Sequence, residues 1–180
     1  MQAEGSIIEL CHVTRDLDAA LLHWTRDLGA GPFFVFDVPV LPGQFYYGNP
    51  TAVSMRVGFG FSGGVLIELL EQTNDGASPF RDFLHERGEG LHHVMPRCDF
   101  DAGHARLSAA GHEIAYAGRM PSGERFCLFD TRAANGAYIE LMELSAAMLN
   151  SLSLMAKAHA AWDGKRDPIR PMARLAEFAT

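Results

Sequence analysis

Residues 7–33, IIELCHVTRDLDAALLHWTRDLGAGPF, and residues 90–114, GLHHVMPRCDFDAGHARLSAAGHEI, begin in the same way. Each is interpreted as a short apolar strand followed by an amphipathic helix that starts at an Asp-apolar-Asp-Ala sequence. Asp16 and Asp99 are predicted to cap these helices, because an aspartate at this place accepts hydrogen bonds from free backbone amides. Gly29 and Gly111 are predicted to end them. The chain therefore contains the start of one structural unit twice.

The two units also end alike. Residues 63–72, GGVLIELLEQ, and residues 135–144, NGAYIELMEL, are each a turn followed by a strand that carries Ile-Glu-Leu. Further strand candidates lie between start and end, at residues 52–61, 113–120 and 125–131. An internal repeat of this kind is strong evidence for a duplicated architecture. We expect an α+β fold with two βαβββ modules.

These signals predict how the chain is divided. The modules are expected over about residues 6–72 and 89–144, with a linker at 73–88 that holds a short helix from about Ser78 to Arg87. Residues 6–144 would form one domain, and residues 145–180 a C-terminal extension. The extension begins with a helix that places Met148, Leu149, Leu152 and Met155 near one face. We interpret it as a covering helix, against the sheet or against a partner subunit.

Composition narrows the class of protein. The 180 residues are 48% hydrophobic and 21% charged, as in ordinary globular proteins, and the net charge is −7. An acidic chain without a basic cluster is not expected to bind nucleic acid or an anionic membrane. No signal peptide and no apolar run of about 20 residues is present, so a cytoplasmic protein is expected. Cys11, Cys98 and Cys127 are interpreted as reduced core thiols, with a metal-binding role less favoured.

Two glutamates stand out because each lies between large apolar neighbours in a predicted strand. Glu68 in LIELL and Glu140 in YIELM occupy equivalent places in the two modules. A buried carboxylate needs a cation or a wet cavity, since an unpaired buried charge is costly. A solvent-facing position on an edge strand is the alternative. The symmetry of the pair favours a role as ligands.

Residues 67–94, IELLEQTNDGASPFRDFLHERGEGLHHV, resemble the central segment of methylmalonyl-CoA epimerases and related glyoxalase-like proteins. With both module starts and the closing Ile-Glu-Leu, the resemblance covers about residues 6–144, and the chain is identified as a member of the vicinal oxygen chelate superfamily. The resemblance implies an open, cup-shaped mixed sheet that holds one divalent metal ion, with one ligand from the first and last strand of each module. It also implies a homodimer and a small-molecule substrate.

The resemblance implies the ligands Glu9, Glu68, His93 and Glu140. Two of them compete with a neighbour. Counting seven residues back from Asp16 favours Glu9 over His12, and side chains three apart on a strand face opposite sides. The second histidine of GLHH favours His93, whereas the same count from Asp99 gives His92. Three carboxylates and one imidazole suit Mg²⁺, Mn²⁺, Fe²⁺, Co²⁺ or Zn²⁺.

The implied activity is that of an isomerase, epimerase or lyase in which the metal chelates two oxygens and stabilises an enolate of a hydrophobic carbonyl substrate. Glu68 or Glu140 would transfer the proton, and Tyr46, Tyr47 and Phe61 are expected to line the substrate pocket. Ser54 stands near the place where the epimerases carry a catalytic glutamate, so that substrate is not assigned. The alternatives are a non-enzymatic binding or resistance protein and an iron-dependent ring-cleavage dioxygenase.

Overall fold

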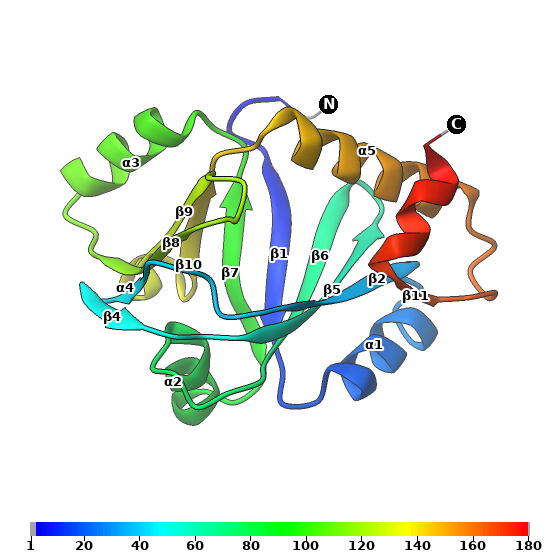
Figure 1. Cartoon of the computed structure of the whole chain (residues 1–180), viewed down its shortest axis with the longest axis horizontal. Helices are drawn as coiled ribbons and strands as arrows, with labels where there is room; N and C mark the ends of the chain where they lie inside the picture. Colours follow the sequence, from blue (N-terminus) through cyan, green and yellow to red (C-terminus); the bar gives the residue numbers. More distant parts are fainter. Residues whose placement is uncertain (1–2, 180) are drawn as a thin grey trace.

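The structure is a computed structural model that describes residues 3–179, and it confirms the expected α+β fold. Its strands form one mixed sheet in the order β11-β2-β5-β6-β1-β7-β10-β9-β8-β3-β4. The sheet is curved and open, and helices lie along its borders and its outer face (Figure 1). Its middle is the antiparallel pair β1 (Ile7–Val13) and β7 (Gly90–Pro96), the opening strands of the two modules.

The predicted β-α-β-β-β order occurs twice. The first module consists of β1, α1 (Leu17–Arg26), β2 (Phe33–Val38), β5 (Met55–Ser62) and β6 (Val65–Gln72). The second consists of β7, α3 (Phe100–Ala109), β8 (Ile114–Arg119), β9 (Arg125–Phe129) and β10 (Tyr138–Met142). In each module the opening strand pairs parallel with the closing strand, β1 with β6 and β7 with β10. The two modules therefore meet with four adjacent central strands, β6-β1-β7-β10.

The predicted helix ends are present. The Asp16 side chain accepts from the amide of Ala19, and Asp99 accepts from the amide of Ala102. Gly29 and Gly111 have φ values of 68° and 82°, a left-handed conformation that favours glycine. The linker helix α2 (Pro79–Glu86) begins after the Ser78 cap, and α4 (Arg132–Asn135) is a single turn before β10.

A ribbon between β2 and β5 links the two modules, and the sequence did not indicate it. Strands β3 (Gln44–Tyr46) and β4 (Asn49–Thr51) form a hairpin, and β3 pairs with the edge strand β8 of the other module. The C-terminal segment returns to the first module. It consists of α5 (Ala146–Ala161), β11 (Ile169–Pro171), which pairs with β2, and the 3-10 helix η1 (Met172–Phe178).

Strand alternation separates two faces of the sheet. Ile67 and Leu69 of β6 pack against α1, and Leu141 of β10 packs with Leu107 of α3, so these side chains belong to the outer layers. The intervening side chains Leu66, Glu68 and Leu70 of β6 point into the concave side. Glu68, the central acidic residue of β6, therefore faces the interior of the cup.

Candidate metal centre

Each of the four central strands contributes one carboxylate or imidazole side chain to a single point on the concave side. Glu9 comes from β1, Glu68 from β6, His93 from β7 and Glu140 from β10, and their ligand-type atoms all lie within 4.8 Å of one another. The four residues are buried, with exposures of 4%, 8%, 2% and 7%. The structure thus brings together all four residues that the sequence assigns to the metal.

The imidazole of His93 is at the centre of this group. Its Nε2 atom lies 3.2 Å from carboxylate oxygens of both Glu68 and Glu140 and 3.7 Å from Glu9. None of these oxygens has hydrogen-bonding geometry to Nε2, so this buried nitrogen has no hydrogen bond. A buried polar atom without a partner carries a free-energy cost. A divalent cation among the four side chains would satisfy the nitrogen and the carboxylates together, and so the residues fit a metal ion.

The electrostatics of the group also favour a cation. Burial raises the pKa of Glu9 to about 8, and the charges of Glu68 and Glu140 add to the increase, against the effect of His93. Burial alone would lower the pKa of His93, but Cys11, Glu140 and Glu68 outweigh it and raise that pKa well above its usual range. The raised pKa of Glu9 shows that its negative charge is unfavourable in this buried group unless a cation compensates it.

The alternative ligands lie elsewhere. His12 faces away from the cup, and its ring makes an edge contact with Trp24 of α1 at a centroid distance of 5.0 Å. The strand register thus places Glu9 inward and His12 outward, in agreement with the alternation argument.

His92 lies behind His93 instead of in the group. Its Nδ1 atom lies 2.9 Å from Nδ1 of His93, and its ring stacks on Tyr138 at 4.6 Å. Burial, and then the charge of His93, lower the pKa of His92 well below its ordinary value, so this ring is neutral. If Nε2 of His93 is a ligand, the Nδ1 proton of His93 is donated to His92. This contact fixes the tautomer and the ring orientation of a ligand histidine.

Cys11 is a member of the site that the sequence interpretation assigned to the core. It follows Glu9 by two residues on β1, and its Cα is paired with those of Glu68 and His93 on the neighbouring strands. Its sulfur lies within 4.8 Å of ligand atoms of both residues, and it is fully buried. The spacing of two residues from Glu9 was the available signal, since such residues share a face.

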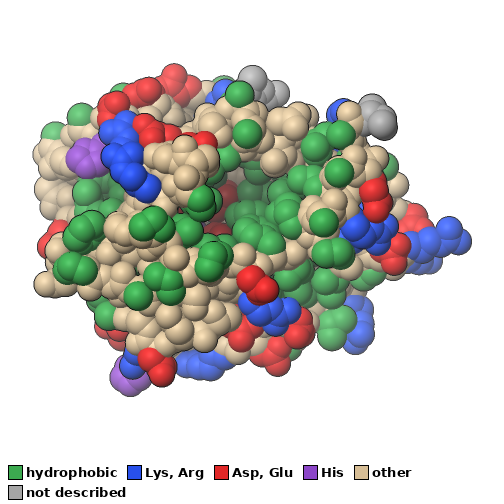
Figure 2. Space-filling view, viewed as in Figure 1, with side chains coloured by type: hydrophobic (Ala, Val, Ile, Leu, Met, Phe, Trp, Pro, Cys, Tyr) green, Lys and Arg blue, Asp and Glu red, His purple; other side chains and the backbone are tan. Residues whose placement is uncertain are grey.

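The concave side holds a cavity of about 460 Å³. Figure 2 shows this hollow, with acidic side chains in its depth and hydrophobic side chains around it. Its lining is mostly apolar and includes Phe36, Phe59, Phe80, Tyr116 and Phe126; outside the ligand group, its polar members are Ser122, Glu124, Ser145 and Ser151. Among the described residues that line it, none is a lysine or an arginine. An apolar hollow with a few convergent polar groups is typical of a small-molecule site.

The sequence assigns Tyr46, Tyr47 and Phe61 to the pocket, and the structure places all three outside the cavity lining. Tyr46 and Tyr47 turn their hydroxyls outward, where they donate to Asp82 and to Asp130. Phe61 packs in the cluster between the sheet and α5. Phe59, two residues before Phe61 on the same face of β5, lines the cavity instead, together with aromatic residues of other strands and Phe80 of α2.

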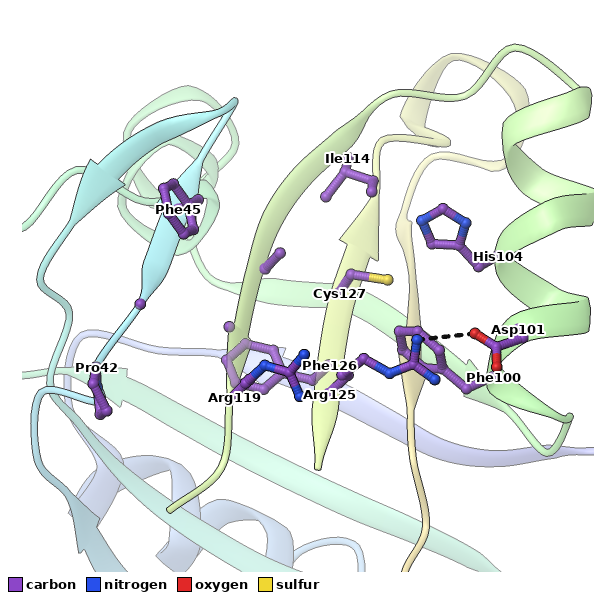
Figure 3. A pocket seen from close by; sticks show the side chains of 13 residues that line it. Pro42, Phe45, Phe100, Asp101, His104, Ile114, Arg119, Arg125, Phe126 and Cys127 are labelled. Atoms are coloured by element: carbon purple, nitrogen blue, oxygen red, sulfur yellow. Dashed lines mark ion pairs between the residues drawn. The ribbon is translucent and has the colours of Figure 1, made fainter. Parts of the chain in front are cut away.

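A second hollow, of about 490 Å³, lies on the other side of β8, between the β3–β4 ribbon and α3 (Figure 3). It contains the side chains of Arg119 and Arg125, but Arg125 is paired with Asp101 at 2.9 Å and with Glu143. Arg119 donates to the carbonyl of Gly123. This hollow contains none of the four candidate ligands, and its arginines have partners within the chain.

Within residues 3–179, no helix is both long and apolar enough to cross a membrane.

A curved sheet of two βαβββ modules, with candidate ligands on the first and last strand of each, defines a vicinal oxygen chelate fold. The chain belongs to the glyoxalase/bleomycin resistance protein/dioxygenase superfamily, whose sequence model matches residues 10–129. No curated protein gives a significant match.

Solved structures show the same fold at low sequence identity. A hypothetical protein from Bacillus halodurans is 20% identical, with a TM-score of 0.57 over 78% of this chain and 94% of that chain. The methylmalonyl-CoA epimerase of Mycobacterium tuberculosis is 22% identical, with a TM-score of 0.55 over 83% of this chain and 96% of that one. The epimerase of Streptomyces coelicolor is 23% identical, with a TM-score of 0.52 over 78% and 97%.

Proposed function

We propose that this protein is a metal-dependent enzyme that moves a proton on the carbon next to a carbonyl group of a neutral, hydrophobic substrate. The observation that carries the proposal is the buried group of Glu9, Glu68, His93 and Glu140 at the floor of an apolar cavity. These side chains would hold the ion. A bound divalent cation would supply Lewis-acid stabilisation of an enolate whose two neighbouring oxygens it chelates.

The carboxylates of the closing strands are placed to exchange the proton. Glu68 and Glu140 both line the cavity and retain 8% and 7% exposure, so a substrate in the cavity can approach them. One of them would accept the proton from the substrate carbon and return it, as a general base and then a general acid. The apolar walls exclude water from the proton and from the carbanion-like carbon. His92 would keep His93 in its ligand orientation.

The cavity argues for a substrate other than a coenzyme A ester. The middle strand β5 presents Met55, Val57 and Phe59 to the cavity, all of them apolar, where the epimerase resemblance requires an acid. No described lysine or arginine of the lining is present to meet phosphate groups. An isomerase, epimerase or lyase acting on an uncharged carbonyl compound fits these walls. The ring-cleavage dioxygenase requires His12 in the site, and His12 packs against Trp24 on the opposite face.

Metal analysis and solvent isotope exchange test this proposal. The purified protein should contain stoichiometric divalent metal, and it should exchange solvent deuterium into the carbon next to the carbonyl of neutral hydrophobic ketones. Glu140→Gln should lose exchange and bind metal more weakly, because one ligand charge is removed. Glu124→Gln is the matched control, since Glu124 lines the cavity but lies outside the ligand group. A protein that binds such ketones equally well with and without metal, and never exchanges, would instead be a binding protein.

A further inference from the structure

The methionines of this chain are concentrated at one place. The sequence has eight, and every one within the described residues lines the cavity: Met55, Met95, Met120, Met142, Met148, Met155 and Met172. They come from strands of both modules, from the turn after β8, from α5 and from η1, so no single element explains the pattern. The core between α1 and the sheet is built from Leu17, Leu21, Phe33, Ile67 and Leu69, without methionine. The concentration is therefore specific to the cavity.

Methionine gives a cavity wall properties that leucine or phenylalanine does not. Its side chain is unbranched and its thioether is polarisable, so it fills gaps of different shape and makes favourable contacts with aromatic rings. Proteins that bind many different partners use methionine-rich surfaces for this reason. A cavity lined by seven such side chains can repack around ligands of different outline.

The C-terminal segment supplies one wall of the cavity. Met148, Leu152 and Met155 lie on one face of α5 and line the cavity with Met172 of η1. This segment lies beyond residues 10–129, to which the superfamily match extends. Leu154 and Met155 also pack with Phe34 and Leu66 of the sheet, and these contacts hold α5 in place. The shape of the cavity on this side therefore depends on residues outside the two βαβββ modules.

We propose that the methionine-lined cavity accepts a range of uncharged, polarisable carbonyl compounds, aromatic or aliphatic, and that Met148 and Met155 of α5 determine the range of shapes admitted. The inference deepens the proposed function, on which it rests. The volume of about 460 Å³ lies in the range of pockets that bind drug-sized ligands. The acidic floor and the absence of described cationic residues in the lining disfavour carboxylates and phosphates.

Displacement of a neutral fluorescent dye, Nile red, by a panel of ketones tests the proposal. The panel contains linear, monocyclic and fused-ring ketones, each with a carboxylate-bearing analogue of similar size. Wild-type dissociation constants for the ketones should fall within about tenfold of one another, and the carboxylates should bind at least about tenfold more weakly. The double substitution Met148→Leu with Met155→Leu conserves volume but stiffens the wall, so the ketone affinities should spread beyond tenfold. Leu149→Met, on α5 but outside the lining, is the control and should match wild type.

The outcomes separate this inference from the proposed enzyme. Binding of a single shape, preference for carboxylates, or an unchanged ketone profile in the double variant would overturn the inference. If the double variant does not fold, the wild-type panel still decides, because it tests both breadth and charge preference. Isotope exchange is measured separately. Broad binding without exchange would contradict only the proposed function, whereas exchange together with binding of a single shape would contradict only the inference.

Discussion

The Nδ1 atoms of His92 and His93 lie 2.9 Å apart, although adjacent residues of a strand normally point to opposite faces. His93 is a candidate ligand, and His92 is buried behind it among Phe80, Phe83 and Tyr138. A neutral ring that accepts the Nδ1 proton of a ligand histidine supports it as an outer-shell partner. His92 is not itself a candidate ligand, but through its contact with His93 it is expected to affect metal affinity.

His92→Phe tests this dependence. The phenyl ring keeps the packing against Tyr138 but removes the hydrogen bond to His93. Metal affinity, measured by competition with a chromogenic chelator, should fall about 10- to 100-fold. His12→Phe changes a histidine on the opposite face and should leave the affinity unchanged. Equal affinities in both variants and wild type would show that His92 is only a packing residue.

Glu9→Gln should have opposite effects on the metal-free and metal-bound protein. Burial raises the pKa of Glu9 to about 8 from an ordinary value of 4.5, so the folded metal-free protein binds this proton more tightly than the unfolded chain. Its stability therefore falls as pH rises between these values. At pH 8 the metal-free variant should be more stable than wild type by roughly 1 to 3 kcal/mol. With saturating metal the order should reverse.

Urea unfolding with EDTA and with metal, at pH 5 and pH 8, measures both effects. The Glu9→Gln advantage should shrink at pH 5, where the wild-type carboxyl holds its proton. An advantage of the same size at both pH values would argue against the charge as its cause.

Asp130→Asn should loosen the attachment of the ribbon to the second module. Asp130 accepts from Arg132 at 2.8 Å and from the hydroxyl of Tyr47 at 2.7 Å, and its pKa falls to about 2, chiefly through the Arg132 bond. A depressed pKa contributes stability that is present above the unfolded value of about 3.8 and is lost as pH falls towards 2. The variant should lose about 1 to 2 kcal/mol at pH 7 and match wild type near pH 2. Asp37→Asn, at an exposed side chain, is the control for thermal or urea unfolding.

Gly60→Ala should destabilise the first module. A Cβ at Gly60 would lie 2.9 Å from ring atoms of Phe33, which is fully buried and cannot move aside. Overpacking of this kind costs about 1 to 3 kcal/mol. Ser62→Ala, on the same strand but exposed, should cost far less in the same urea titration. A stable Gly60→Ala protein would mean that the Phe33 ring shifts without loss of packing.

Much of the fold could be predicted because the duplication repeats its local signals. The caps Asp16 and Asp99 and the closing Ile-Glu-Leu strands are short-range patterns, and each supports the other. Alternation along β1 puts Glu9 and His12 on opposite faces, and the seven-residue count from Asp16 that the family resemblance implies selects Glu9 as the inward residue. These inferences need only neighbours in sequence.

The rest depends on contacts between distant segments. The pairing of β3 with β8 places Phe45 opposite Ala117 across the modules. Neither short segment carries a sequence signal that predicts this pairing. Without that ribbon, Tyr46 and Tyr47 could not be recognised as outward-facing. The position of α5 over the cavity also follows from tertiary packing. Its amphipathic face predicted only a covering helix, and not the surface that it covers.

The meeting of the modules at β1 and β7 has a consequence for the origin and mechanics of the site. Glu9 and Glu68 belong to the first module, and His93 and Glu140 to the second, so each half supplies an equal share of the donors. A single ancestral module could have assembled such a centre only by association with a copy of itself. In the present chain, an ion bound there would link the two modules, and its binding energy would oppose their separation. Any hinge motion about the β1–β7 seam would then change ion affinity directly.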